Sequence, residues 1–163
     1  MINKYSVSNY DLPSLFKLIA QDVFVKTGQN KLLFLTEHFF DRNFYTCYST
    51  HGARLCFSWK ELDFLLGDNP EEIIYPLLLL RNYSFYRRIF SKICWKIRRH
   101  RINAIVPVYE ERNIICLIVF VGRDYKDILI NSYYQSDFQQ KMNYCLKSVI
   151  LYNQAVNRLI KKS

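Results

Sequence analysis

The stretch NAIVPVYEERNIICLIVFVGRDY, residues 103–125, decides the fold. It contains two apolar segments, 103–109 and 114–121, which are joined by a charged turn from Glu110 to Asn113. Four-residue turns are among the common connections of β-hairpins. The stretch therefore predicts two adjacent antiparallel strands.

Three earlier segments also have the composition of strands. They are KLLFLT (31–36), FYTCYS (44–49) and ARLCFS (53–58). The last two flank Thr50, His51 and Gly52, which predict a tight hairpin. Together with the hairpin above, these segments predict a central antiparallel sheet of five or six strands.

The segments around the strands have helical periodicity. Apolar residues recur at intervals of three and four from residue 12 to residue 23, which predicts a first helix that ends at Gly28. Ser58 and Glu61 have the spacing of a capping box and predict a short helix that ends at Gly67. A further helix is expected from residue 69, and Pro76 is expected to kink or stop it.

Two more helices are expected later in the chain. From Ser84 onward, apolar side chains share one face and basic side chains occupy much of the other. The last helix begins at about Asp137. The resulting order is helix, three strands, helical insert, two strands and helix, which is typical of an α+β domain. With 163 residues, half of them hydrophobic, the chain is expected to form a single domain over 1–163.

The net charge of +9 is unevenly distributed, because a basic cluster lies within fifteen residues of the sequence. Such a cluster can attract polyanions, and it is also typical of a solvated helix face. The cluster is the candidate basic patch: Arg87, Arg88, Lys92, Lys96, Arg98, Arg99 and Arg101.

The sequence contains no recognised catalytic or metal-binding motif. Its five cysteines are scattered without a C-x-x-C pair, which argues against a disulfide framework and a zinc knuckle. Since each cysteine has apolar neighbours, we expect buried, reduced thiols in a cytoplasmic protein. The histidines His38, His51 and His100 are expected near turns, exposed to solvent. The longest apolar run, 114–121, is far shorter than the about 20 residues that span a bilayer. We therefore expect no catalytic residue, no metal site and no membrane insertion.

The expected last helix has a heptad pattern, since apolar residues recur at alternating intervals of four and three from Phe138 to Leu159. This pattern predicts a homodimer in which the first helix joins the contact. The alternative is that Phe138 to Val149 packs on the sheet and that the rest of the helix frays. The candidate interface residues are Leu12, Phe16, Ile19, Val149, Tyr152, Val156 and Leu159.

The whole pattern resembles a GAF domain, the sensory module of many bacterial signalling proteins. The segment INAIVPVYEERNIICLIVFVGRDY is similar to the family's strand–turn–strand. DLPSLFKLIAQDVFVKTGQNKLLFLT resembles its opening helix and first strand, and YYQSDFQQKMNYCLKSVILYNQAVNRLI resembles its last helix. One departure is Cys116, where the family usually has glycine. The related PAS and longin-type folds share the same outline.

The resemblance implies a ligand pocket between the sheet and the helical insert, roughly residues 57–101. The cyclic-nucleotide, bilin and haem ligands of the family each need residues that are not found here in the required pattern, so the cofactor stays unknown. The resemblance also implies a non-enzymatic regulatory module that relays a small-molecule or partner signal to an output domain such as a kinase, phosphatase or cyclase. The alternative is a basic adaptor that binds nucleic acid or an acidic protein partner.

Overall fold

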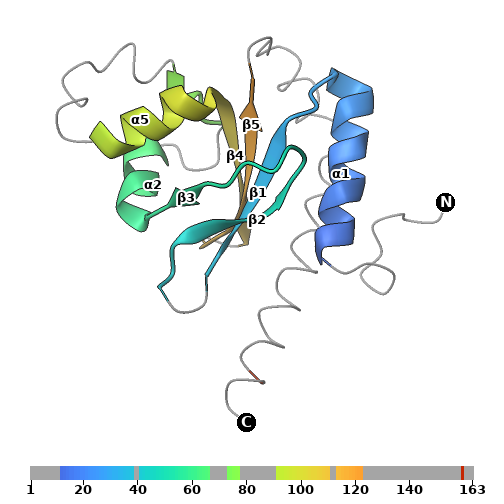
Figure 1. Ribbon diagram of the computed structural model, residues 1–163. Helices are drawn as coiled ribbons and strands as arrows, with labels where there is room; N and C mark the ends of the chain where they lie inside the picture. The colour runs from blue at the N-terminus through green and yellow to red at the C-terminus, as the bar shows by residue number, and fades with distance from the viewer. Residues whose placement is uncertain are drawn as a thin grey trace.

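The computed structural model describes residues 12–38, 41–66, 73–77, 91–110, 113–122 and 159. Its elements are helix α1 (Leu12–Thr27), strands β1 (Leu32–Glu37), β2 (Phe44–Ser49) and β3 (Cys56–Phe57), helices α2 (Trp59–Leu66) and α5 (Ser91–His100), and strands β4 (Ile102–Glu110) and β5 (Asn113–Val121). Figure 1 shows the sheet at the centre of the molecule, with α1 on one side and α2 and α5 on the other.

The five strands form one antiparallel sheet in the order β3-β2-β1-β5-β4. Strands β1 and β5 pair at its centre, with Leu32 opposite Phe120 and Thr36 opposite Cys116. The α+β class, the antiparallel pairing and the helical insert between β3 and β4 are therefore confirmed. This is the arrangement of sheet and insert that the resemblance to GAF domains implied.

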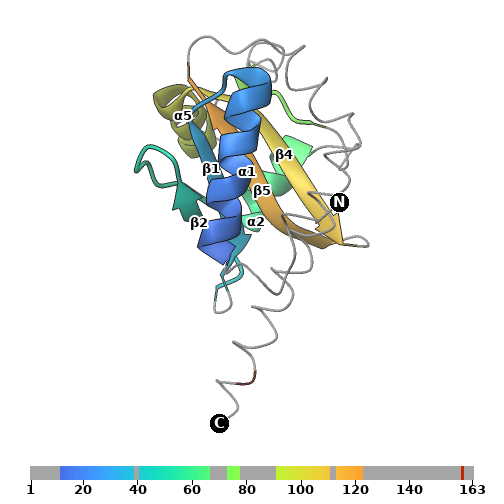
Figure 2. The same cartoon turned by 90° about the vertical axis from the view of Figure 1, so that its right-hand side faces the viewer.

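Both faces of the sheet are covered, and this explains the continuous apolar run in β5. Residues 114–121 are all buried, with alternate side chains in two separate apolar clusters. One cluster includes Phe16 and Ile19 of α1, and the other includes Leu62 of α2 and Ile97 of α5. Figure 2 shows α1 in front of the sheet and α2 and α5 behind it. A strand that packs against helices on both sides needs apolar residues at every position.

Helix α1 ends as the sequence predicts. Gly28 has a φ of 75°, a backbone conformation that glycine adopts readily, and its N–H donates to the Phe24 carbonyl at 2.8 Å. The chain then turns into β1, whose first backbone N–H, that of Leu32, donates to Thr50 Oγ1 at 2.9 Å.

Helix α2 begins with the expected capping box. The Glu61 N–H donates to Ser58 Oγ at 3.2 Å, and the Ser58 N–H donates to Glu61 Oε1 at 3.0 Å. Glu61 also accepts a hydrogen bond from Lys96 of α5 at 2.9 Å, and the same ammonium group donates to the Cys56 carbonyl at 2.6 Å. One lysine thus joins α5, α2 and β3.

Three local expectations are corrected. Thr50, His51 and Gly52 do not form a tight hairpin, since β2 pairs with β3 only at Phe44 and Tyr45 and the chain makes a wide loop between them. The helix expected from residue 69 to Pro76 does not include Ile74, which pairs with Ile105 of β4. The turn between the last two strands is shorter than expected, because β4 continues to Glu110 and β5 already begins at Asn113.

Two residues of the expected dimer interface also need correction. Phe16 and Ile19 are both 0% exposed within the single chain, because they pack against the sheet. They belong to the core and are not available to a partner. Val149, Tyr152 and Val156 lie outside the described residues, as do Arg87 and Arg88 of the basic patch and Cys145. Leu159 is helical and 69% exposed.

We predict that Lys96→Met destabilises the fold by about 1–3 kcal/mol, because it leaves the mostly buried Glu61 carboxylate without its cation. Urea unfolding followed by tryptophan fluorescence measures the loss. The matched control is Lys92→Met on the same helix, where the side chain is exposed. Equal unfolding midpoints for the two variants would contradict the structural role of Lys96.

Candidate functional site

The candidate site is a cleft of about 700 Å³ at the end of the sheet where β1 begins and β5 ends. It is lined by residues from four parts of the chain, namely 28–31, 51 and 53, 99–101, and 121–122. These segments are the α1–β1 turn, the β2–β3 loop, the α5–β4 junction and the end of β5. We call this hollow the basic cleft, because Lys31, Arg99 and Arg101 line it.

Backbone hydrogen bonds hold the main chain of two of these residues, Lys31 and Arg101, at the end of β5. The Val121 N–H donates to the Lys31 carbonyl, and the next residue, Gly122, donates to the Arg101 carbonyl, both at 3.2 Å. The Gln29 side chain strengthens the same corner by donating to the carbonyls of Val121 and Lys31. The backbones that carry Lys31 and Arg101 are therefore held by the end of one central strand.

Arg101 has an unusual backbone conformation. It follows the last residue of α5 with a φ of 52°, and its N–H donates to the Arg98 carbonyl at 3.3 Å. This left-handed position after a helix usually holds glycine or asparagine, because a Cβ there costs about 1–2 kcal/mol. The arginine therefore has a conformational cost, and no described hydrogen bond or ion pair of its side chain offsets that cost.

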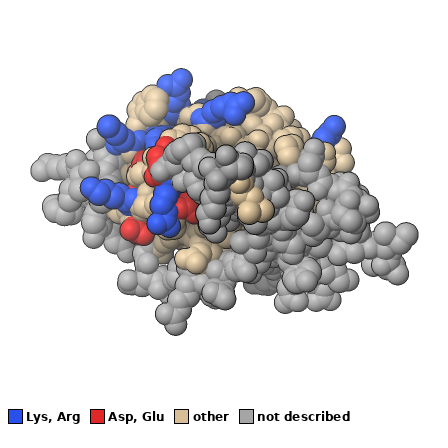
Figure 3. All heavy atoms as spheres, turned by 90° about the horizontal axis from the view of Figure 1, so that it is seen from below, with Lys and Arg blue, Asp and Glu red and all other residues tan. Residues whose placement is uncertain are grey.

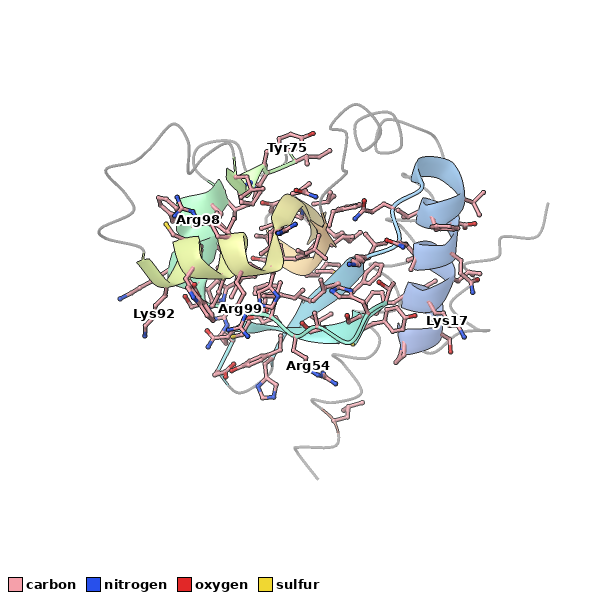
Figure 4. All side chains as sticks on the ribbon, turned by 45° about the horizontal axis from the view of Figure 1, so that its top comes forward. Lys17, Arg54, Tyr75, Lys92, Arg98 and Arg99 are labelled. Atoms are coloured by element: carbon pink, nitrogen blue, oxygen red, sulfur yellow. The ribbon has the colours of Figure 1, made fainter. Side chains whose placement is uncertain are left out.

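The neighbouring arginines differ in direction and contacts. Arg98, Arg99 and Arg101 are all exposed, as the sequence predicts. Arg98 and Arg99 point in different directions from α5, with Arg99 toward the β2–β3 loop (Figure 4), and of the two only Arg99 lines the cleft. The Arg99 guanidinium lies 4.7 Å from the centre of the Trp95 ring, a cation–π contact that orients it.

Two histidines complete the polar lining. Partial burial, together with the positive charges of Lys31 and His100, lowers the pKa of His51 below its usual value of 6.5. Partial burial and the charge of Arg99 lower the pKa of His100 in the same direction. Both imidazoles therefore favour the neutral form in a cleft that already holds several cations.

Acidic side chains are absent from the described lining of the basic cleft. Elsewhere on the described surface, some opposite charges form ion pairs, as in the Arg42–Glu37 pair at 2.9 Å. Viewed from below, acidic and basic side chains lie next to each other (Figure 3). The cleft is thus a local excess of positive charge.

The described residues do not combine a nucleophile with a base in the manner of a catalytic site. Thr50 Oγ1 lies 3.5 Å from His51 Nδ1, but this hydroxyl donates to the Asn30 carbonyl at 2.8 Å and accepts from Leu32 N–H. Complete burial raises the pKa of Cys116 well above its usual value of 9.0, which keeps this thiol protonated. Cys94 is also buried, whereas Cys47 is exposed, contrary to expectation, and Cys56 is half-buried.

Other candidate features in the described ranges are weaker. No group of three or more His, Cys, Asp or Glu side chains there is arranged to hold a metal ion. Nor is any helix in these ranges both long and apolar enough to cross a membrane. A second hollow, of about 350 Å³, lies between α1 and the end of β2, beside the exposed side chains of Phe24 and Val25.

Comparison with known proteins gives one structural similarity. The chain matches no protein-family model and no curated protein sequence. Among solved structures, it is similar to the GAF domain/HD domain protein from Geobacter sulfurreducens, with 13% sequence identity and a TM-score of 0.47. The similarity covers 86% of this chain and 93% of that one.

We predict that Arg101→Gly stabilises the fold by up to about 1 kcal/mol, because glycine adopts the left-handed conformation without a Cβ clash. Thermal and urea unfolding of the variant beside the parent protein measure the change. A loss of stability would mean that the Arg101 side chain supports the fold instead of serving the cleft.

We also predict that stability falls as the pH is lowered from about 7 to about 5. Because the folded-state pKa values of His51 and His100 lie below 6.5, the unfolded chain binds more protons in this range, and unfolding is favoured as the pH falls. The double variant His51→Gln/His100→Gln should have a flatter dependence of unfolding free energy on pH. An unchanged slope would exclude these two groups as its source.

Proposed function

We propose that the protein is a non-enzymatic, GAF-like regulatory module that binds a small molecule in the basic cleft and relays the signal to an output domain or partner protein. The observation that carries the proposal is a ligand-sized cleft whose polar groups converge from four chain segments onto a rigid sheet end. Ligand sites in proteins are usually concavities of this size with a few convergent polar groups.

The position of the cleft suits a regulatory role. It is formed by the α1–β1 turn, the β2–β3 loop and the α5–β4 junction, so a bound molecule would contact the ends of α1 and α5 together. These helices cover opposite faces of the sheet. A ligand that binds one arrangement of the two helices more tightly than another shifts the population between them.

The alternative, a basic adaptor for nucleic acid, is less well supported by the distribution of charge on α5. Lys96 is bound to Glu61, so its charge is compensated within the fold. Lys92, Lys96 and Arg99 have the spacing of one helix face, but because Lys96 is paired, the described part of α5 presents an interrupted stripe of positive charge to a nucleic-acid backbone.

We further propose that the module is a homodimer joined by its last helix. The heptad pattern that includes Val149, Tyr152, Val156 and Leu159 supports this proposal, as does the 69% exposure of Leu159. Since Phe16 and Ile19 are core residues, any contribution of α1 would come from its exposed apolar residues, Phe24 and Val25.

We expect the double variant Val156→Glu/Leu159→Glu to separate the dimer, because each buried apolar side chain contributes about 1.5–3 kcal/mol and buried carboxylates repel each other. Sedimentation of the variant beside the parent protein at micromolar concentration measures the change. Leu77→Glu, at an exposed apolar residue beside the Ile74–Ile105 bridge, is the control and should leave the dimer intact. If parent and double variant have the same mass in solution, the last helix is not the interface.

A further inference from the structure

We propose that the basic cleft binds a small phosphorylated molecule, with its phosphate groups held by Lys31, Arg99 and Arg101. This inference rests on the proposed function, since it names the chemical class of the ligand. It is carried by the composition, geometry and size of the cleft together.

The first argument is the uncompensated charge. Lys31, Arg99 and Arg101 carry fixed positive charges into one concavity, and no carboxylate among the described residues forms an ion pair with any of them. Like charges that converge without a counter-charge destabilise the folded state. A bound dianion would remove this repulsion and form charge-assisted hydrogen bonds with each cation.

The second argument is that ordinary helix electrostatics explain only part of this charge. Cations in the last turn of a helix interact favourably with its dipole, which accounts for Arg98, Arg99 and His100 at the end of α5. Lys31 and His51 come from other parts of the chain. Arg101 follows the helix in a conformation that favours glycine. Lys31 and His51 lack that explanation, and at Arg101 the interaction with the dipole has to offset the cost of the left-handed backbone.

The third argument concerns the type of cation. An arginine side chain can bind two phosphate oxygens at once through its planar guanidinium group, while a lysine acts as a compact charge. The combination of two arginines, one of them oriented by Trp95, with one lysine is suited to phosphate. A volume of about 700 Å³ is large enough for a phosphorylated metabolite and lies within the usual range of small-molecule sites.

Binding should take up protons at the two histidines. The charged groups that face His51 and His100 from the surrounding elements are Lys31, Arg99 and Arg101, and the described lining contains no acidic group. A phosphate dianion favours the imidazolium form and raises both pKa values. By linkage, binding of the dianion is coupled to proton uptake by the two histidines.

The probe for the test is pyrophosphate, followed by intrinsic fluorescence and by calorimetry. Trp95 contacts Arg99 and reports movement of its guanidinium, and Trp59→Phe removes the other tryptophan of the chain. We expect saturable binding to the parent protein. Arg101→Gly and Lys31→Gln should each weaken it by about tenfold, the effect of losing one charge-assisted hydrogen bond.

The matched control is Arg42→Gly. Arg42 is the other described arginine with a left-handed backbone, at a φ of 62°, and it lies outside the cleft, bound to Glu37. This variant makes the same change of charge and backbone and should bind pyrophosphate as the parent does. Equal affinities for Arg101→Gly, Arg42→Gly and the parent would overturn the inference, as would no binding of pyrophosphate at millimolar concentration.

Two further probes distinguish the source of the phosphate. Duplex DNA of random sequence and vesicles of phosphatidylcholine with phosphatidic acid present the same chemistry on a polymer or a surface. If either binds more tightly than pyrophosphate, with a steep log–log dependence on salt that Arg101→Gly reduces, the small-molecule inference is wrong. A shallow dependence with weaker binding supports it.

The same measurements on Val156→Glu/Leu159→Glu separate this inference from the proposed function. Pyrophosphate binding that persists in the monomer supports the cleft ligand independently of the dimer. A metabolite without phosphate groups could stabilise the parent protein but not Arg101→Gly, while pyrophosphate stabilises neither protein. In that case the proposed ligand class is wrong and the regulatory proposal stands.

Discussion

The structure depends on the pairing of β1 with β5 and on the burial of both faces of that pair. Residues 114–121 of β5 and residues 32–35 of β1 are all buried, so a bare face on either side would expose a row of large apolar side chains. At about 1.5–3 kcal/mol for each buried side chain, neither face can remain open to water. Helix α1 must therefore cover one face, and α2 together with α5 must cover the other.

The sequence predicts the parts of this fold that depend on residues close together in the chain. The apolar runs, the end of α1 at Gly28 and the capping box of Ser58 with Glu61 each depend on residues a few positions apart, and each was predicted. Residues 50–52 do not form the predicted hairpin, because the end of β2 pairs with β1. Thr50 bonds to Leu32 of β1 through its backbone and its hydroxyl, and the end of β2 follows β1 instead of turning back to β3.

The cleft could not be predicted, because its residues come together only when the sheet is assembled. The basic cluster in the sequence directed attention to seven residues, and of the five that the structure describes, Arg99 and Arg101 line the cleft. Lys96, from the same cluster, has a structural role in the contact with Glu61. Lys31 and His51 lie far away in sequence. One signal was available: an arginine between a helix and a strand, where glycine is the usual residue.

The packing constraint and the cleft are physically connected. Because β1 and β5 are fixed by burial on both faces, their ends hold Lys31 and Arg101 in place through the carbonyls bonded to Val121 and Gly122. The backbones that carry these cations therefore stay at the same end of the sheet, where partial burial, together with the neighbouring positive charges, lowers the pKa values of the two histidines. Because the main chain is already in place, an anion that binds there needs the exposed side chains of Lys31, Arg99 and Arg101 to become ordered but little movement of the backbone. An anion that binds there offsets the repulsion among these cations. Its affinity therefore depends on the burial that holds the central strands in place.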